Sequence, residues 1–452
     1  MHLGSTRTHK KMNTAQERFK ELNDAIHMGF QRRNKSMASK NLCVAITNNI
    51  LNIETRGRSR KLKDELSFKL GVELILADLM VASNVVESRW IYRPSGNDRF
   101  SNELVKRVTF KKVINLMESA GLVERAKGGN HSNPFHNGEG KSKAFNPGLA
   151  TRFRVTELLL LIAATHGIEP QNIPDHYLRA LPTNVIKKRA SPITHNGRRV
   201  SGRVMPVVKT DEFESLAREV KVINRYLDKQ HLESAVFSGY YRSFNMGDDP
   251  SFNWDKGGRL YSPGKDSYQK LKKERRLSAI RINHEPVAEV DINASYLSIF
   301  YGMNGRRLPE KKDLYKVPRL HRKIVKAWIH SAFGKGTYPT RWPSETKAKL
   351  IANGICMDKL TMTKVGRRVC DAIPILKLLD TSKITWADLM YQESRAVISA
   401  MASLRENFNI PAYSMHDGLI VPVSGKEIAA NEIMRAFDDL GLECRVKIEV
   451  QA

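Results

Sequence analysis

The chain has 452 residues, of which 41% are hydrophobic and 27% charged, so it can form two or three globular domains and is not a disordered protein. Its formal net charge of +28 indicates a polyanionic partner, most simply nucleic acid, with a membrane surface as the weaker alternative. The longest apolar run, residues 158–164, is too short to span a bilayer, and the polar N-terminus is not a signal peptide. Four scattered cysteines without metal-binding spacing favour a reducing cytoplasm.

Residues 1–60 are predicted to be a basic helical arm. They contain 12 Lys or Arg and 4 Asp or Glu, and two helices are expected, around Thr14–His27 and Met37–Leu51. A basic cluster, residues 31–35, separates the helices. The arm is either a solvated tail or a segment that lies along phosphates, and the sequence leaves both alternatives open.

Residues 61–167 are predicted to form one compact domain. Apolar residues recur at helical spacing over 66–82, and Thr109 caps a helix whose apolar face includes Val113 and Met117. Strands are expected at 122–125 and 151–155, joined by a long Gly/Asn/His loop. This order resembles winged-helix domains, with residues 106–117 as the recognition helix. The resemblance implies DNA binding by Lys106, Arg107, Lys111 and Lys112, although winged helices also serve as protein–protein modules.

Residues 168–210 are predicted to be a basic, proline-punctuated linker. The stretch 181–210 contains no acidic residue. It includes the run Lys187, Lys188 and Arg189, which is expected to follow backbone phosphates.

In residues 211–452, the segment around Asp291 is the first of three that carry functional signals. Residues 287–290 predict a buried strand, and residues 294–300 predict a helix. Asp291 therefore lies where a strand ends, and Tyr296 follows five residues later. Such an aspartate is either a cap for the next helix or a carboxylate that the sheet presents for chemistry.

The second segment is a predicted helix within 319–336. Arg322, Lys326, His330 and Phe333 recur along one helical stripe. Two cations and an aromatic ring on one face suit a triphosphate at one end and a stacked base at the other. A solvated basic face is the alternative.

The third segment is a predicted β-hairpin over 412–422. Two apolar runs flank His416, Asp417 and Gly418, which form the turn. Asp417 is either an ordinary turn residue or a second carboxylate for the same site. Helices are expected before the hairpin, over 386–407, and after it, over 425–440, and an alternating strand over 443–450.

In this order, the three segments resemble the family A DNA polymerases over about residues 255–452. Asp291 matches the aspartate of motif A, the helix with Arg322, Lys326 and Phe333 matches the fingers helix of motif B, and His416-Asp417 matches the His-Asp-Glu hairpin of motif C.

Several positions depart from the family pattern. Gly418 replaces the glutamate of motif C, and Phe333-Gly334 replaces Tyr-Gly one residue early. Tyr296 stands where family A has glutamate. In this respect the chain is similar to family B polymerases and reverse transcriptases, whose tyrosine blocks a ribose 2′-OH. The Tyr-x-Asp-Asp sequence of reverse transcriptases is absent.

The resemblance implies an α+β fold, with a winged helix followed by a polymerase-like palm, an antiparallel sheet with helices, in residues 211–452. It implies a DNA polymerase of a plasmid, phage or mobile element that uses dNTPs, a DNA primer-template and two Mg²⁺ ions, with Mn²⁺ as a substitute. Asp291 and Asp417 would bind the metals. The rivals are a non-catalytic replication initiator and a primase or single-subunit RNA polymerase.

Further roles follow from the same resemblance. The carbonyl of Ile292 would be an additional metal ligand. Arg322 and the catalytic Lys326 would neutralise the pyrophosphate. Tyr296 would lie beneath the sugar. His330 and Phe333 are expected at the nucleotide, and His416 at the DNA.

Overall fold

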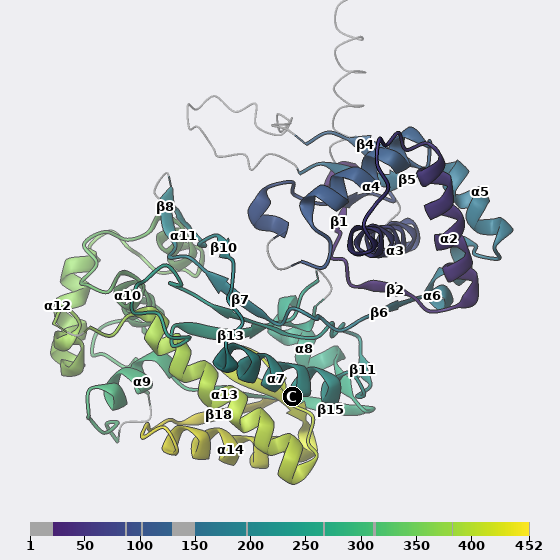
Figure 1. The fold of residues 1–452 in the computed structure, drawn as a ribbon. Helices are drawn as coiled ribbons and strands as arrows, with labels where there is room; N and C mark the ends of the chain where they lie inside the picture. Colours follow the sequence, from purple (N-terminus) through teal and green to yellow (C-terminus); the bar gives the residue numbers. More distant parts are fainter. Residues whose placement is uncertain are drawn as a thin grey trace, which may run out of the picture. The chain divides into compact units, whose positions relative to one another are not determined.

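The computed structural model of the protein describes residues 21–85, 88–100, 103–128, 150–195, 198–264, 267–310, 313–381 and 383–451. The chain divides into two compact units, Met1–Asn184 and Val185–Ala452 (Figure 1). Helices and several small sheets are mixed in it, which confirms the predicted α+β class. Among the described residues, none of the helices combines the length and apolar character that crossing a bilayer requires.

The N-terminal unit combines a helical cluster with a small sheet of order β1-β3-β5-β4. Its elements are β1 (Ile26–His27), β2 (Arg32–Asn34), α2 (Met37–Asn52), α3 (Leu62–Val85), β3 (Ile91–Tyr92), α4 (Arg107–Ser119), β4 (Val123–Ala126), β5 (Arg152–Val155), α5 (Glu157–Thr165), α6 (Ile173–His176) and β6 (Tyr177–Arg179).

The predicted helices over 37–51, 66–82 and 106–117 are confirmed as α2, α3 and α4, and the two predicted strands as the antiparallel pair β4 and β5. Apolar periodicity explains α4, because Phe110, Val113, Ile114 and Met117 are buried together. The ring of Phe110 packs edge-on against Phe153 of β5, with 5.7 Å between ring centroids. The loop predicted between β4 and β5 lies largely outside the described residues.

The prediction that residues 1–60 form a separate arm is wrong for the residues that the structure describes. Met28, Phe30 and Leu42 lie in the same core as α3 and α4, and Ile26–His27 form a strand instead of a helix end. Residues 14–20 of the predicted first helix lie outside the described range. Arg32 of the basic cluster pairs with buried Asp78 at 2.9 Å, so its charge is already compensated inside the unit.

The predicted linker, residues 168–210, is structured throughout most of its described length. Ile168, Ile173 and Tyr177 belong to the N-terminal core, whereas Val185 and Ile186 belong to the C-terminal core. The unit boundary therefore falls inside the predicted linker. Basic composition did not prevent folding, because the few apolar residues of this stretch join both cores.

The basic run 187–189 lies on strand β7 and not on a flexible segment. Lys187 and Lys188 place their amino groups over the rings of Tyr241 and Phe252, at 3.7 and 4.8 Å from the centroids. Arg189 donates to the carbonyl of Gly202 at 3.2 Å. These cations therefore lie on a strand of the C-terminal unit and not on a flexible linker, while their expected contact with phosphates stays a prediction.

The C-terminal unit is organised around strand β15 (Glu285–Ile292), which pairs antiparallel with both β17 (Gly418–Pro422) and β18 (Val446–Val450). The sheet order is β11-β14-β15-β17-β16, with β18 also on β15. Its other strands are β11 (Leu232–Glu233), β14 (Arg281–Ile282) and β16 (Tyr413–Ser414). β-Branched and small residues make β15 a buried strand, as predicted.

A second sheet of the C-terminal unit has the order β10-β7-β12-β13. Its strands are β7 (Ile186–Arg189), β10 (Val204–Met205), β12 (Tyr241–Phe244) and β13 (Gly257–Tyr261), and a separate hairpin joins β8 (Ile193–His195) to β9 (Arg198–Val200).

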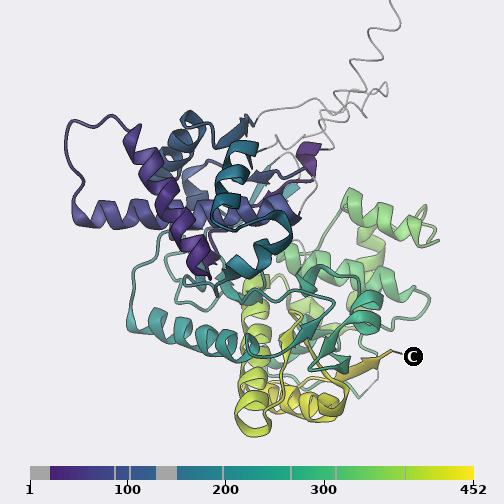
Figure 2. The same ribbon diagram turned by 90° about the vertical axis from the view of Figure 1, so that its right-hand side faces the viewer.

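Helices complete this unit. They are α7 (Asp211–Leu227), α8 (Lys273–Ala279), α9 (Ser295–Met303), α10 (Arg322–Lys335), α11 (Ser344–Ala352), α12 (Met362–Ala372), α13 (Trp386–Phe408) and α14 (Lys426–Asp438). The long α13 packs against α14, and α14 packs on the sheet (Figure 1). Helices α10, α11 and α12 form a group of their own (Figure 2). The predicted helices over 386–407 and 425–440 are confirmed as α13 and α14.

Candidate active site

The two predicted carboxylates line one pocket in the C-terminal unit. Asp291 is the residue before the end of β15 and pairs in register with Gly418, the residue after Asp417. The amide of Ile292 donates to the carbonyl oxygen of Asp417 at 2.9 Å, so the two aspartates lie on neighbouring backbone segments. Asp417 is exposed and Asp291 is half-buried.

This pocket has a volume of about 340 Å³ and an unusually charged lining. Five of the residues predicted for the site line it: Asp291, Ile292, Arg322, Lys326 and Asp417. The other lining residues are Lys273, Arg276, Glu289, Asn293, Ala294, Tyr315, Met415, Lys447 and Glu449. Segments distant in sequence thus bring two acids and two cations, as predicted, to one concave surface.

Tight backbone turns present both aspartates. After β15, Ala294 adopts a left-handed conformation with φ of 51°, and α9 begins at the next residue. Before β17, His416 adopts φ of 69°, while the amide of Met415 donates to the carbonyl of Gly418 at 2.8 Å. This confirms the predicted hairpin with Asp417 in its turn.

Gly418 explains one departure from the family A pattern. A Cβ atom at this position would lie 2.5 Å from the carbonyl oxygen of Val290 and 2.8 Å from Oδ1 of Asp291. Since real side chains do not approach so closely, the backbone leaves no room for the glutamate that motif C carries. Glycine allows the Asp291 side chain to lie against the neighbouring strand.

Helix α10 supplies the two cations. Arg322 donates from Nε to Oδ2 of Asp313 at 2.8 Å, and its guanidinium lies 5.1 Å from the centroid of the Tyr315 ring. Lys326, one turn further along the helix, is exposed and also lines the pocket. The N-terminal half of α10 therefore faces the aspartates with positive charge.

Phe333 does not occupy the predicted base-stacking position. Its side chain is only 3% exposed and packs against Phe300 of α9, with 5.2 Å between ring centroids. The stripe predicted on α10 changes environment at its last residue, because α9 covers Phe333. Of this stripe, Arg322, Lys326 and His330 are exposed, and Phe333 belongs to the core.

Tyr296 lies beside the pocket but outside the residues that line it. Its half-buried ring is 6.4 Å from the rings of both His330 and Phe333. The guanidinium of Arg259 lies 5.5 Å from its centroid. Burial raises the pKa of the Tyr296 phenol above its ordinary value, so the phenol is neutral at pH 7.

His416 is packed inside the unit and carries no charge at neutral pH. Its ring lies 5.1 Å from that of Tyr261. Burial lowers the pKa of His416 to about 4, and the charge of Arg259 acts in the same direction. In the protein without DNA, His416 is therefore neutral, and its expected contact with DNA stays a prediction.

Sequence reasoning missed a lysine that neutralises the acids of this pocket. Nζ of Lys273 on α8 lies 2.9 Å from Oδ2 of Asp291, 2.6 Å from Oε2 of Glu449 and 3.4 Å from Oε2 of Glu289. Burial alone would lower the pKa of Lys273, but hydrogen bonds to Asp291 and Glu449 outweigh it and raise the pKa. Register explains the cluster, because β15 and β18 place Glu289 directly opposite Glu449.

A second missed feature is a buried ion pair behind the pocket. Glu393 of α13 is 1% exposed, accepts from Nε of Arg259 at 2.7 Å and accepts from Oγ of Ser295 at 2.7 Å. Burial raises the pKa of Glu393 to about 7, and the charge of Arg259 opposes this shift. The pair fixes Arg259 next to Tyr296, and no local sequence pattern signals it.

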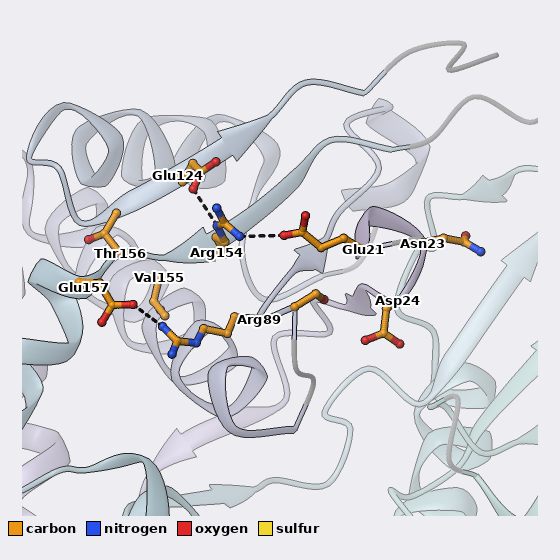
Figure 3. A pocket seen from close by; sticks show the side chains of 10 residues that line it. Glu21, Asn23, Asp24, Arg89, Glu124, Arg154, Val155, Thr156 and Glu157 are labelled. Atoms are coloured by element: carbon orange, nitrogen blue, oxygen red, sulfur yellow. Dashed lines mark hydrogen bonds and ion pairs between the residues drawn. The ribbon is translucent and has the colours of Figure 1, made fainter. Parts of the chain in front are cut away.

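A larger hollow, about 1080 Å³, lies in the N-terminal unit and has a different character. Figure 3 shows Arg154 between Glu21 and Glu124, at 2.8 and 2.7 Å, and Arg89 next to Glu157 at 2.6 Å. Its arginines are thus already paired with acids of the same unit. Among the described residues, this hollow shows no grouping of side chains suited to catalysis.

Comparison with known proteins adds no assignment. No protein-family model matches the chain, and no curated protein matches it either.

Proposed function

We propose that the C-terminal unit is a template-directed DNA polymerase that adds dNTPs to a DNA primer by nucleotidyl transfer. The observation that supports this proposal is the meeting of Asp291, Asp417, Arg322 and Lys326 in one pocket. Two acids that face two cations suit a reaction in which a magnesium triphosphate is bound and pyrophosphate leaves.

The residues present fit divalent magnesium. Carboxylate and carbonyl oxygens are its preferred protein ligands, and Asp291, Asp417 and the Ile292 carbonyl supply them. When bound, two Mg²⁺ or Mn²⁺ ions would activate the primer hydroxyl and neutralise the leaving pyrophosphate. Lys273 forms an ion pair with Asp291 and so orients this carboxylate.

The side chains of α10 and α9 have the remaining roles. Arg322 and Lys326 would bind the triphosphate, because both are exposed cations on the wall of the pocket. Arg322 is held by Asp313, which limits its range of positions before the substrate binds. Tyr296, beside the pocket, would restrict the space beneath the sugar.

A primer-extension assay tests the proposal directly. The full chain is incubated with primed DNA, Mg²⁺, and either dNTPs or rNTPs. Extension with dNTPs supports a DNA polymerase. Extension with rNTPs alone supports a primase or RNA polymerase, and DNA binding without any extension supports a non-catalytic replication initiator.

We propose further that the N-terminal unit binds the DNA of a plasmid, phage or mobile element in the cytoplasm, and that it does so as a winged helix. Helix α3, strand β3, helix α4 and the antiparallel strands β4 and β5 follow one another in the order of that fold. Lys106, which precedes α4, and Lys111 on α4 are exposed. Lys112 pairs with Glu54, and Arg107 donates to the Ser95 carbonyl at 2.6 Å. The net basic charge of the chain and its four free thiols suit such a setting.

Removing lysine charges at α4 tests which of these lysines contact DNA. We expect Lys106→Gln combined with Lys111→Gln to weaken DNA binding and to reduce the slope of log affinity against log salt by about 1–2. Lys112→Gln is the matched control on the same helix, and we expect it to leave the slope unchanged because its charge is already compensated. Binding is measured by fluorescence anisotropy from 50 to 200 mM salt, roughly the range in which phosphate contacts weaken. An unchanged slope in the double variant would contradict DNA contact through these two lysines.

A further inference from the structure

Two histidines and a glutamate meet at the edge of the main sheet, at the opposite end of β15 from Asp291. Nδ1 of His284 lies 2.7 Å from Oε1 of Glu233, and Nδ1 of His231 lies 3.4 Å from the same oxygen. All three ligand atoms lie within 4.8 Å of one another. The two imidazole rings are mostly exposed, and solvent ions can reach them.

The backbone holds these three side chains together without help from a ligand. His231 and Glu233 are two residues apart on an extended segment, so they project from the same face. Strand β11 pairs with β14, with Glu233 opposite Arg281. The amide of Asn283 donates to the carbonyl of His231 at 2.8 Å, which ties the β14–β15 turn to the start of β11.

The turn itself fixes His284. Asn283 and His284 have φ of 51° and 70°, the conformation of a tight two-residue hairpin connection. The amide of His231 donates back to Oδ1 of Asn283 at 2.9 Å. The backbone conformation of the turn and two hydrogen bonds therefore position His284 next to Glu233.

The arrangement has an electrostatic peculiarity. Oε1 of Glu233 is shielded from solvent and accepts no hydrogen bond from the described residues. It faces Nδ1 of both imidazole rings, and each of these nitrogens carries either a lone pair or a hydrogen, depending on the tautomer. When both Nδ1 atoms carry lone pairs, three electron-rich atoms face one another, an arrangement that suits a bound metal ion; a hydrogen on one Nδ1, donated to Glu233, is the alternative.

We propose that His231, Glu233 and His284 form a binding site for a divalent transition metal ion such as Zn²⁺. Ligand atoms about 2.0–2.2 Å from a tetrahedral ion lie about 3.4 Å apart. The His231–Glu233 separation of 3.4 Å matches this value, and the His284–Glu233 separation of 2.7 Å is shorter, so the exposed His284 ring would move outward to admit the ion. Two imidazole nitrogens and one carboxylate favour such an ion over Mg²⁺, which prefers oxygen ligands. The fourth position is left for water.

This site is separate from the pocket of the proposed polymerase. His284 precedes Asp291 by seven residues along extended chain, roughly 23 Å at the rise of a strand. A metal ion here would join β11 to the turn between β14 and β15. Its expected effect is to stabilise this sheet edge, whether or not the proposed polymerase activity is correct.

A cobalt titration of the full chain tests the site. After dialysis against a chelator, we expect Co²⁺ to produce visible absorption bands at a stoichiometry of one, and Zn²⁺ to abolish them. His231→Ala and His284→Ala should each raise the Kd for Co²⁺ at least about a hundredfold, since each removes one of three ligands. His166→Ala, in the N-terminal unit, and the double variant Asp291→Asn, Asp417→Asn should retain the bands.

Thermal unfolding provides an independent readout. Zn²⁺ should raise the melting temperature of the unmodified chain and leave that of His284→Ala unchanged, because a ligand stabilises only a folded state that binds it. Because the two rings are exposed, both histidine variants should melt near the unmodified chain in chelator. The proposal is wrong if Co²⁺ bands are absent from the unmodified chain, which would leave an ion pair with a protonated histidine, or if they persist in both histidine variants.

Discussion

Replacing Asp291 or Asp417 by asparagine should reduce primer extension by at least about a thousandfold. Each substitution keeps the shape of the side chain and removes the negative charge that a divalent ion requires. Because the backbone around Gly418 leaves no space for a further acid there, no residue at that position can replace the lost carboxylate. We therefore expect the double variant to extend primers at about the same rate as either single variant, since both acids act as one unit.

Glu285→Gln is the matched control for these variants. Glu285 lies on the same strand, β15, but accepts hydrogen bonds from Ser424 and does not line the pocket. We expect its extension rate to stay within about threefold of the unmodified chain, because an amide retains one acceptor. Extension by either aspartate variant within tenfold of the unmodified rate, with unchanged melting temperature, would falsify the assignment of these two acids.

Substitution of Tyr296 should change which sugar the enzyme accepts. If the ring lies beneath the sugar, Tyr296→Ala removes a steric block and should raise rNTP incorporation at least about a hundredfold while dNTP incorporation stays within about tenfold. The ring also packs on His330 and Phe333, so some loss of stability is expected as well. The assay should therefore run well below the melting temperature of the variant.

Tyr296→Phe separates the two possible roles of the ring. It keeps the aromatic volume and removes only the phenol oxygen, so sugar discrimination should remain that of the unmodified chain. If Tyr296 is only a core aromatic, Tyr296→Ala should instead lower the free energy of unfolding by about 3–5 kcal/mol and reduce both activities together. Parallel loss of rNTP and dNTP incorporation, without a change in their ratio, is the outcome that contradicts a role in sugar selection.

Local patterns predicted the elements well where one face is buried. Apolar spacing marked α2, α3, α4 and α13, and a β-branched run marked β15. Domain limits were predicted poorly. The sequence between 168 and 210 is basic and rich in proline, yet its few apolar residues enter two separate cores. Charge composition describes the surface of a segment and does not reveal whether its apolar minority is buried.

The candidate site was predicted only in part, for a related reason. Asp291 and Asp417 each lie at a recognisable strand end or turn, so their positions could be inferred from local structure. Lys273 and Glu449 reach the same pocket through α8 and through pairing between β15 and β18, which no local pattern specifies. Phe333 was misplaced because helical spacing defines a face but does not define which neighbour covers it.

The strand order around β15 also has a consequence for how the chain folds. Strand β15 pairs with β17 and β18, which follow it only after helices α9 to α13 and α14 respectively. Contacts between residues so distant in sequence require large loops to close before they contribute stability, and such topologies fold slowly. The pairing that brings Asp291 next to Asp417 is therefore expected to be a slow step in the folding of the C-terminal unit.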